Sequence, residues 1–144
     1  MIWREHTLYR EATGETVAVV DESESGDVLR FGCHDLRFRS MNPAHLRAAS
    51  ADGEEFVLRK RSLTVSRYTA HCGGPRDGRD YTAYRFGARG RREIRDAAGQ
   101  LCAVTTPKAD GSLKVELCGE PTLDLVFITW ALTYVDAAVR RTYY

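Results

Sequence analysis

The segment Thr122–Arg141 constrains the fold more than any other part of the sequence. It contains neither Gly nor Pro, and its apolar residues cover almost every side of a helix. A helix that is apolar all round must be buried on all sides, either in a membrane or inside a protein. The uncharged run Leu125–Val135, between Asp124 and Asp136, has 11 residues, whereas a membrane-spanning helix needs about 20. We therefore predict a helix in a protein interior and no transmembrane span.

The rest of the chain is typical of β-structure. Short runs rich in Val, Leu, Thr, Tyr and Phe recur and are separated by Gly, Asp, Asn and Pro. We expect strands over Trp3–Arg10, Glu15–Asp21, Val28–Phe31, Asp35–Arg39, His45–Ala49, Glu54–Arg59, Leu63–Ala70, Asp80–Phe86, Arg92–Asp96, Leu101–Thr106 and Ser112–Cys118. A barrel of about eight strands is filled by its own side chains, so an internal helix needs a wider one. The sequence therefore predicts a mainly β fold: a closed antiparallel β-barrel of about 10–12 strands around a buried C-terminal helix, forming one domain over residues 1–144.

The same patterns assign roles to individual residues. Leu63 and Val65 alternate with polar neighbours, so we expect one face of their strand to be buried and the other wet. Asp124 stands in the first turn of the helix, where a carboxylate can bond free backbone N–H groups. Thr129 and Thr133 can bond back to helix carbonyls of the preceding turn.

The four cysteines, Cys33, Cys72, Cys102 and Cys118, are widely spaced. The first residues lack the apolar stretch of a signal peptide, so we expect a cytoplasmic protein with free thiols. The pairs Cys33-His34 and His71-Cys72 could in number supply a zinc site, but neighbours on a strand point to opposite faces. Adjacency also gives the thiol neither a depressed pKa nor an orienting group. We therefore predict no metal, no cofactor and no catalytic residue.

Three stretches of the second half resemble a family of small fungal proteins of unknown function with a tubby C-terminal-like fold. They are Gly78–Arg85, Arg95–Ala103 and Leu123–Trp130 followed by Arg140-Arg141, so that the resemblance spans Asp77–Arg141. The superfamily includes tubby-like proteins, phospholipid scramblases and LURP-one-related proteins. The resemblance implies a closed barrel around a hydrophobic helix. It also implies binding of phosphoinositide head groups by Lys and Arg on the outer wall.

Two basic clusters are the candidate ligand-binding residues. One comprises Arg59, Lys60, Arg61 and Arg67; the other surrounds Gly87 and Gly90 and includes Arg85, Arg89 and Arg92, with Arg91 and Arg95 beside them. Arginine suits phosphate because its guanidinium donates two parallel hydrogen bonds. The alternative is that both clusters are solvated turns whose charges oppose aggregation.

The overall charge excludes one class of partner and leaves three functions open. Because 21 basic residues face 20 acidic ones, the net charge of +1 gives no general attraction to nucleic acid, and we predict no specific nucleic-acid binding. We expect a non-catalytic module that binds phosphoinositide or another anionic lipid head group, peripherally at a membrane surface. One alternative is a small enzyme or carrier of an apolar ligand, with a pocket between the barrel wall and the helix. The other is a module that interacts with proteins or oligomerises through a strand edge, or through Trp3 and Tyr143-Tyr144.

Overall fold

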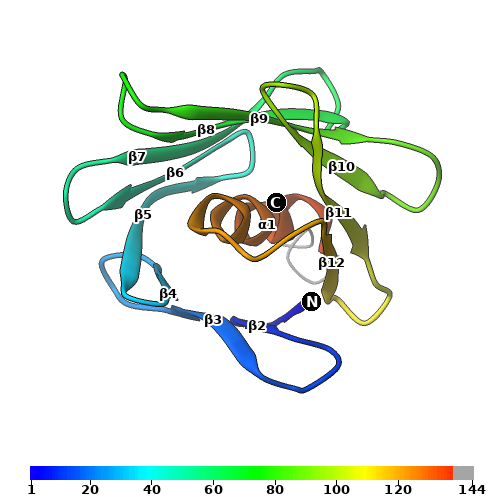
Figure 1. The fold of residues 1–144 in the computed structure, drawn as a ribbon, viewed down its shortest axis with the longest axis horizontal. Helices are drawn as coiled ribbons and strands as arrows, with labels where there is room; N and C mark the ends of the chain where they lie inside the picture. The colour runs from blue at the N-terminus through cyan, green and yellow to red at the C-terminus, as the bar shows by residue number, and fades with distance from the viewer. Residues whose placement is uncertain (138–144) are drawn as a thin grey trace.

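A computed structural model describes residues 1–137 of the chain. Twelve antiparallel strands close into a barrel, and one helix, α1 (Leu123–Asp136), runs through its middle (Figure 1). The predicted mainly β fold with a buried C-terminal helix is therefore confirmed. The basic end of the predicted helix, Arg140-Arg141, and the pair Tyr143-Tyr144 lie outside the described residues.

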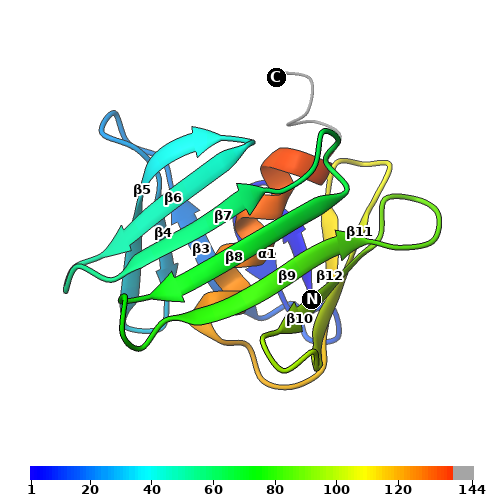
Figure 2. The ribbon, with the colours of Figure 1, turned by 90° about the horizontal axis from the view of Figure 1, so that it is seen from above.

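The strands follow one another around the barrel in sequence order. They are β1 (Ile2–Arg4), β2 (Thr7–Tyr9), β3 (Thr16–Asp21), β4 (Val28–Phe31), β5 (His34–Asn42), β6 (His45–Ser50), β7 (Glu55–Lys60), β8 (Arg67–Gly73), β9 (Arg79–Arg85), β10 (Arg92–Asp96), β11 (Leu101–Pro107) and β12 (Leu113–Leu117). Each strand pairs with the next, and β1 closes the ring on β12 through Ile2↔Lys114 and Trp3↔Leu113. Figure 2 shows the helix framed by this meander of hairpins.

The first predicted strand, Trp3–Arg10, is in fact a hairpin. It turns at Glu5 and His6, which separate β1 from β2, and Glu5 adopts a φ of 52°. The register places Trp3 directly opposite Leu8, so that both side chains enter the core. No Gly or Asn marks this turn, which is why the sequence reads as one strand.

The predicted strand Leu63–Ala70 begins too early. Leu63 is 101% exposed, and β8 begins only at Arg67. Hydroxyl hydrogen bonds hold the preceding loop together, because Ser62 Oγ donates to the Thr64 carbonyl and Thr64 Oγ1 lies 2.8 Å from Ser66 Oγ. The expected buried face with Leu63 is therefore wrong, and its side chain points into solvent.

The helix is enclosed along its whole length. Every side chain from Asp124 to Asp136 is buried, and the Phe127 ring packs against Phe38 and Phe56 at centroid distances of 5.7 and 5.6 Å. Thr122 caps its first turn by accepting a hydrogen bond from the backbone N–H of Leu125. Within residues 1–137, no helix combines the length and apolarity needed to cross a bilayer.

Candidate functional site

One end of the barrel gathers six loops around the last turn of α1. The strands alternate in direction, so the loops after β1, β3, β5, β7, β9 and β11 all emerge at this end. We call it the Asp136 end, because Arg92 at the start of β10 and the carbonyls of Val65 and Ser66 meet there beside Asp136. The opposite end carries the loops after β2, β4, β6, β8 and β10, together with the connection from β12 to the helix.

Charge at the Asp136 end is divided between two sides. Loop residues 43–44, 61–66 and 86–91, on the side of β5 to β10, contain no Asp or Glu. We call their basic residues, with those at the adjoining strand ends, the basic face: Arg59, Lys60, Arg61, Arg67, Arg89 and Arg91. On the other side, the loops after β1, β3 and β11 carry Glu5, Glu22, Glu24, Asp27 and Asp110. A negatively charged surface would therefore meet attraction on one side and repulsion on the other.

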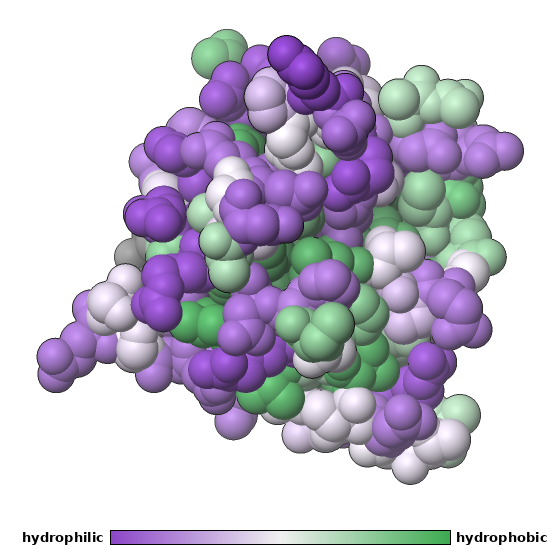
Figure 3. All heavy atoms as spheres, turned by 60° about the vertical axis from the view of Figure 1, so that its left-hand side comes forward, coloured by the Kyte–Doolittle hydropathy of each residue, from purple (hydrophilic) through white to green (hydrophobic). Residues whose placement is uncertain are grey.

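The basic face is available to a ligand. Arg59 Nη2 lies 3.4 Å from His45 Nε2, and Arg61 Nε donates to Thr69 Oγ1 at 2.8 Å. Arg89 is exposed, with a φ of 69°. Among the described residues, no member of the basic face makes an ion pair with Asp or Glu. Hydrophilic side chains cover much of the neighbouring outer wall seen from the β5 side, with smaller apolar areas between them (Figure 3).

Two apolar side chains stand exposed among these cations. The structure describes three large hydrophobic residues as exposed, and two of them, Leu63 and Tyr84, adjoin the basic face. Leu63 lies in the loop between Arg61 and Arg67, and the Arg67 guanidinium lies 5.6 Å from the Tyr84 ring centroid. The loop between β7 and β8 therefore presents an exposed leucine between two arginines of the basic face.

The structure removes Arg92 from the predicted outer-wall site. Its side chain is 0% exposed, because Arg92 shares the inward face of β10 with Ile94. Arg92 Nε donates to Asp136 Oδ2 at 2.5 Å, and Nη2 donates to Oδ1 at 3.0 Å. Arg85 also donates to Asp136 Oδ1, at 3.0 Å. These two arginines hold the end of the helix. Arg92 is therefore wrongly placed with the surface cations, whereas the Arg85 side chain remains 31% exposed.

A matching contact holds the other end of the helix. Arg79 Nε donates to Asp124 Oδ2 at 2.6 Å, and the Tyr81 hydroxyl donates to the same oxygen at 2.6 Å. Burial, followed by this hydrogen bond, raises the pKa of Tyr81. The predicted position of Asp124 in the first turn of the helix is confirmed, but Thr122 is the cap, and the Asp124 carboxylate accepts its hydrogen bonds from the barrel wall.

The His71-Cys72 pair has the opposed geometry expected on a strand. His71 Nδ1 lies 2.8 Å from Asp80 Oδ1 and is partly exposed, whereas Cys72 is buried in the core. Burial raises the pKa of the Cys72 thiol, so the thiol stays protonated and is a poor nucleophile. Throughout the described part of the chain, no three His, Cys, Asp or Glu side chains gather in a way that could hold a metal ion.

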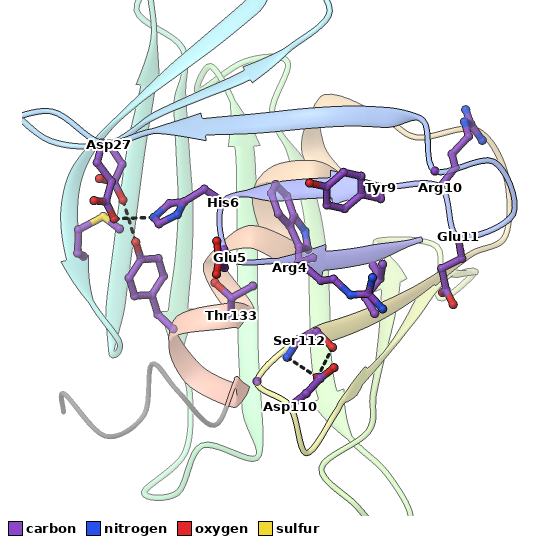
Figure 4. A pocket seen from close by; sticks show the side chains of 17 residues that line it. Arg4, Glu5, His6, Tyr9, Arg10, Glu11, Asp27, Asp110, Ser112 and Thr133 are labelled. Carbon is purple, nitrogen blue, oxygen red and sulfur yellow. Dashed lines mark hydrogen bonds and ion pairs between the residues drawn. The ribbon is translucent and has the colours of Figure 1, made fainter.

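A cavity of about 1280 Å³ opens beside the β1–β2 hairpin (Figure 4). Its lining includes Trp3 and His6 from the hairpin, Asp27 from the loop after β3 and Tyr134 from the helix. Sequence reasoning did not identify these residues as a group. No motif connects them, and only closure of the ring between β1 and β12 brings them together.

Comparisons of the chain with protein-family models, with curated proteins and with solved structures gave no match.

Proposed function

We propose that this chain is a non-catalytic module that binds anionic membrane surfaces through the basic face. The observation that carries the proposal is the exposed Leu63 placed between Arg61 and Arg67, in a loop at one end of the barrel. An exposed leucine is costly in water and favourable in a bilayer interface, and the cations beside it suit phosphate.

The magnitudes are adequate for reversible binding. Each Lys or Arg close to an anionic leaflet contributes about 1 kcal/mol, and burying a leucine side chain contributes about 1.5–3 kcal/mol. The binding free energy from several cations of the basic face adds to that from Leu63, and the sum is larger than either source provides alone. Glu22, Glu24 and Asp27 lie across the Asp136 end and oppose a flat approach, so the favoured orientation tilts the basic face toward the lipid.

Phosphorylated head groups are the favoured ligands within this class. A guanidinium can donate two parallel hydrogen bonds to phosphate, and the basic face contains five arginines and one lysine. The motif resemblance to the tubby C-terminal-like fold supports a phosphoinositide among the anionic lipids. Binding requires no metal and no covalent step.

The test is sedimentation of the protein with vesicles of phosphatidylcholine alone, with added phosphatidylserine, and with added phosphoinositide. We expect binding only to the anionic vesicles, and loss of binding in Lys60→Glu with Arg61→Glu. A matched control is Arg39→Glu with Arg76→Glu, two exposed arginines outside the basic face. Absence of binding by the unaltered protein at physiological salt, or equal loss in both double variants, overturns the proposal.

A second arm separates a membrane from a free phosphate compound. Leu63→Ser leaves the charge of the basic face unchanged and removes the apolar side chain. We expect it to weaken vesicle binding by about tenfold and to leave binding of a soluble inositol phosphate unchanged. Equal binding of vesicles by Leu63→Ser and the unaltered protein would show that Leu63 does not enter the lipid.

A further inference from the structure

The loop between β7 and β8 carries three hydroxyl side chains in a setting without acidic charge. They are Ser62, Thr64 and Ser66. No Asp or Glu occurs in the sequence between Glu55 and Asp77, and basic residues stand on both sides of the loop. These hydroxyl groups therefore lie within the basic face.

Thr64 is the most accessible of the three residues. It is exposed, whereas Ser62 and Ser66 are half-buried. The Ser62 hydroxyl donates to the Thr64 carbonyl at 2.6 Å, and the Ser66 carbonyl accepts the backbone N–H of Arg85 at 2.8 Å. These contacts turn the Ser62 hydroxyl back onto the loop and hold Ser66 on the barrel wall.

The backbone before Thr64 is also open to an enzyme. Backbone hydrogen bonds hold the two ends of the loop, from the Lys60 N–H to the Ala44 carbonyl and from the Arg61 N–H to the Arg67 carbonyl. In the part of the chain that the structure describes, no backbone hydrogen bond involves residues 62–64. An exposed loop tip of this kind can be engaged by another protein without unfolding the domain.

The residues around Thr64 form a pattern that protein kinases with a preference for basic substrates recognise. Arg61 stands three positions before Thr64, Val65 follows it, and Arg67 stands three positions after it. Arg61 uses Nε in its hydrogen bond to Thr69 Oγ1, which leaves the terminal N–H groups of the guanidinium for recognition. Charge patterns of this kind around the hydroxyl decide which substrate a kinase accepts.

Thr13 provides an internal comparison. It is exposed and also follows an arginine, Arg10, by three positions. However, Glu11 and Glu15 bring negative charge to its neighbourhood. A kinase that selects basic segments should therefore accept Thr64 and reject Thr13.

We propose that Thr64 is a phosphorylation site that releases the protein from anionic membranes. A protein kinase with bound ATP supplies the phosphoryl group. Thr64 Oγ1 forms a bond to the γ-phosphorus, the bond from that phosphorus to the β-phosphate oxygen breaks, the hydroxyl proton passes to the catalytic aspartate of the kinase, and ADP leaves. The inference rests on the proposed function, because it concerns the regulation of the same basic face.

A phosphate on Thr64 opposes membrane binding in two ways. It adds a charge of about −1.5 to −2 at pH 7, which repels an anionic leaflet and competes with lipid phosphate for Arg61 and Arg67. It also places this charge next to Leu63, whose side chain enters the bilayer interface in the proposed function. One unit of charge near an anionic leaflet changes binding by about fivefold, so phosphorylation should weaken vesicle binding by about thirtyfold.

The first experiment tests the modification and needs no membrane. The folded protein is incubated with ATP and the lipid-independent catalytic fragment of protein kinase C, and mass spectrometry locates the phosphate. We expect phosphate on Thr64 and none on Thr13. Thr64→Val should abolish the incorporation, and Arg61→Gln should slow it. Absence of phosphate on Thr64, or equal incorporation at Thr13, overturns the inference.

The second experiment measures the effect on binding to vesicles of phosphatidylcholine with added phosphatidylserine. We expect the phosphorylated protein to bind about thirtyfold more weakly than the unmodified protein. Thr64→Glu, which adds one charge without a kinase, should bind about fivefold more weakly. Thr64→Gln, its neutral control, and Thr13→Glu should bind like the unaltered protein.

The outcomes separate this inference from the proposed function. If the unmodified protein binds the vesicles and phosphorylation of Thr64 leaves binding unchanged, the regulatory role is wrong and the membrane-binding proposal stands. Equal binding by Thr64→Glu and Thr64→Gln leads to the same conclusion. If the unmodified protein does not bind anionic vesicles, the proposed function fails, and the regulatory role of Thr64 fails with it.

Discussion

Replacing Asp136 by Asn should destabilise the barrel by about 3–5 kcal/mol, because it leaves a buried guanidinium without its counter-charge. Arg92 is 0% exposed and gives Asp136 two hydrogen bonds, at 2.5 and 3.0 Å. An asparagine preserves the shape of the side chain and removes the charge. The change therefore isolates the electrostatic part of the contact from packing.

The other end of the helix supplies a matched comparison. Asp124 also binds an arginine, but the Arg79 side chain is 46% exposed, so water continues to solvate it when the partner charge is lost. Asp124→Asn should therefore cost only about 1–2 kcal/mol. The two substitutions are chemically identical and lie on the same helix. The difference between their losses of unfolding free energy therefore reports how much more a buried arginine (Arg92) depends on its carboxylate than an exposed one (Arg79).

Urea unfolding followed by tryptophan emission gives both free energies of unfolding. The double substitution Arg92→Met with Asp136→Leu removes the fully buried pair of charges and leaves Arg85, whose side chain is 31% exposed and can be solvated. It should recover most of the stability lost in Asp136→Asn. A cost below about 1 kcal/mol for Asp136→Asn, or equal costs for the two asparagine variants, would refute the reasoning.

Three further predictions concern the core, a thiol pair and pH. Phe127→Ala should cost about 3–5 kcal/mol in urea unfolding, because the ring is fully buried between Phe38 and Phe56; a cost near zero would mean that the helix is not packed in the barrel. Cys102 and Cys118 are free and face each other across β11 and β12, where the Cys118 N–H donates to the Cys102 carbonyl at 2.9 Å. Opposed residues on neighbouring antiparallel strands are close enough to form a disulfide. Oxidised glutathione should therefore remove two titratable thiols from the protein. Cys118→Ser should prevent this loss of thiols, and Cys33→Ser should not. Burial, and then the charges of Arg59 and Arg47, lower the pKa of His45 in the folded protein. The folded state therefore favours neutral His45, and this contribution to the free energy of unfolding is complete above the unfolded-state pKa near 6.5. It is lost as the pH falls through the lower folded-state pKa. His45→Gln should flatten this part of the stability profile, and an unchanged profile would contradict the assignment.

The general architecture follows from properties that are local in the sequence. The run Leu125–Val135 is too short for a bilayer and too apolar for a surface, which leaves a protein interior. Alternating apolar residues and turn residues then mark most of the strands that enclose it. The β1–β2 hairpin was missed because its turn uses Glu5 at positive φ, and the sequence does not signal that conformation.

The sites were less predictable because they depend on which side of the barrel wall a residue faces. Arg92 and Arg91 are neighbours, yet Arg92 is buried against Asp136 while Arg91 is exposed beside Phe86. Leu63 looked like a core residue, but the hydroxyl hydrogen bonds of its loop turn the backbone away from the strand. The cavity wall unites residues of β1 and α1 that are more than a hundred positions apart, and only barrel closure brings them together.

The most direct measurement is the depth of a reporter placed at Leu63. In Leu63→Trp, the new indole replaces a fully exposed side chain, whereas Trp3 and Trp130 are buried at 1% and 0% exposure. Anionic vesicles that contain brominated lipid should quench the added emission and shift it to shorter wavelength, with no comparable change when a tryptophan replaces exposed Thr13 near the opposite end. Vesicles that bind the protein but leave the emission at position 63 unchanged, or that quench the reporter at position 13 instead, would contradict the account.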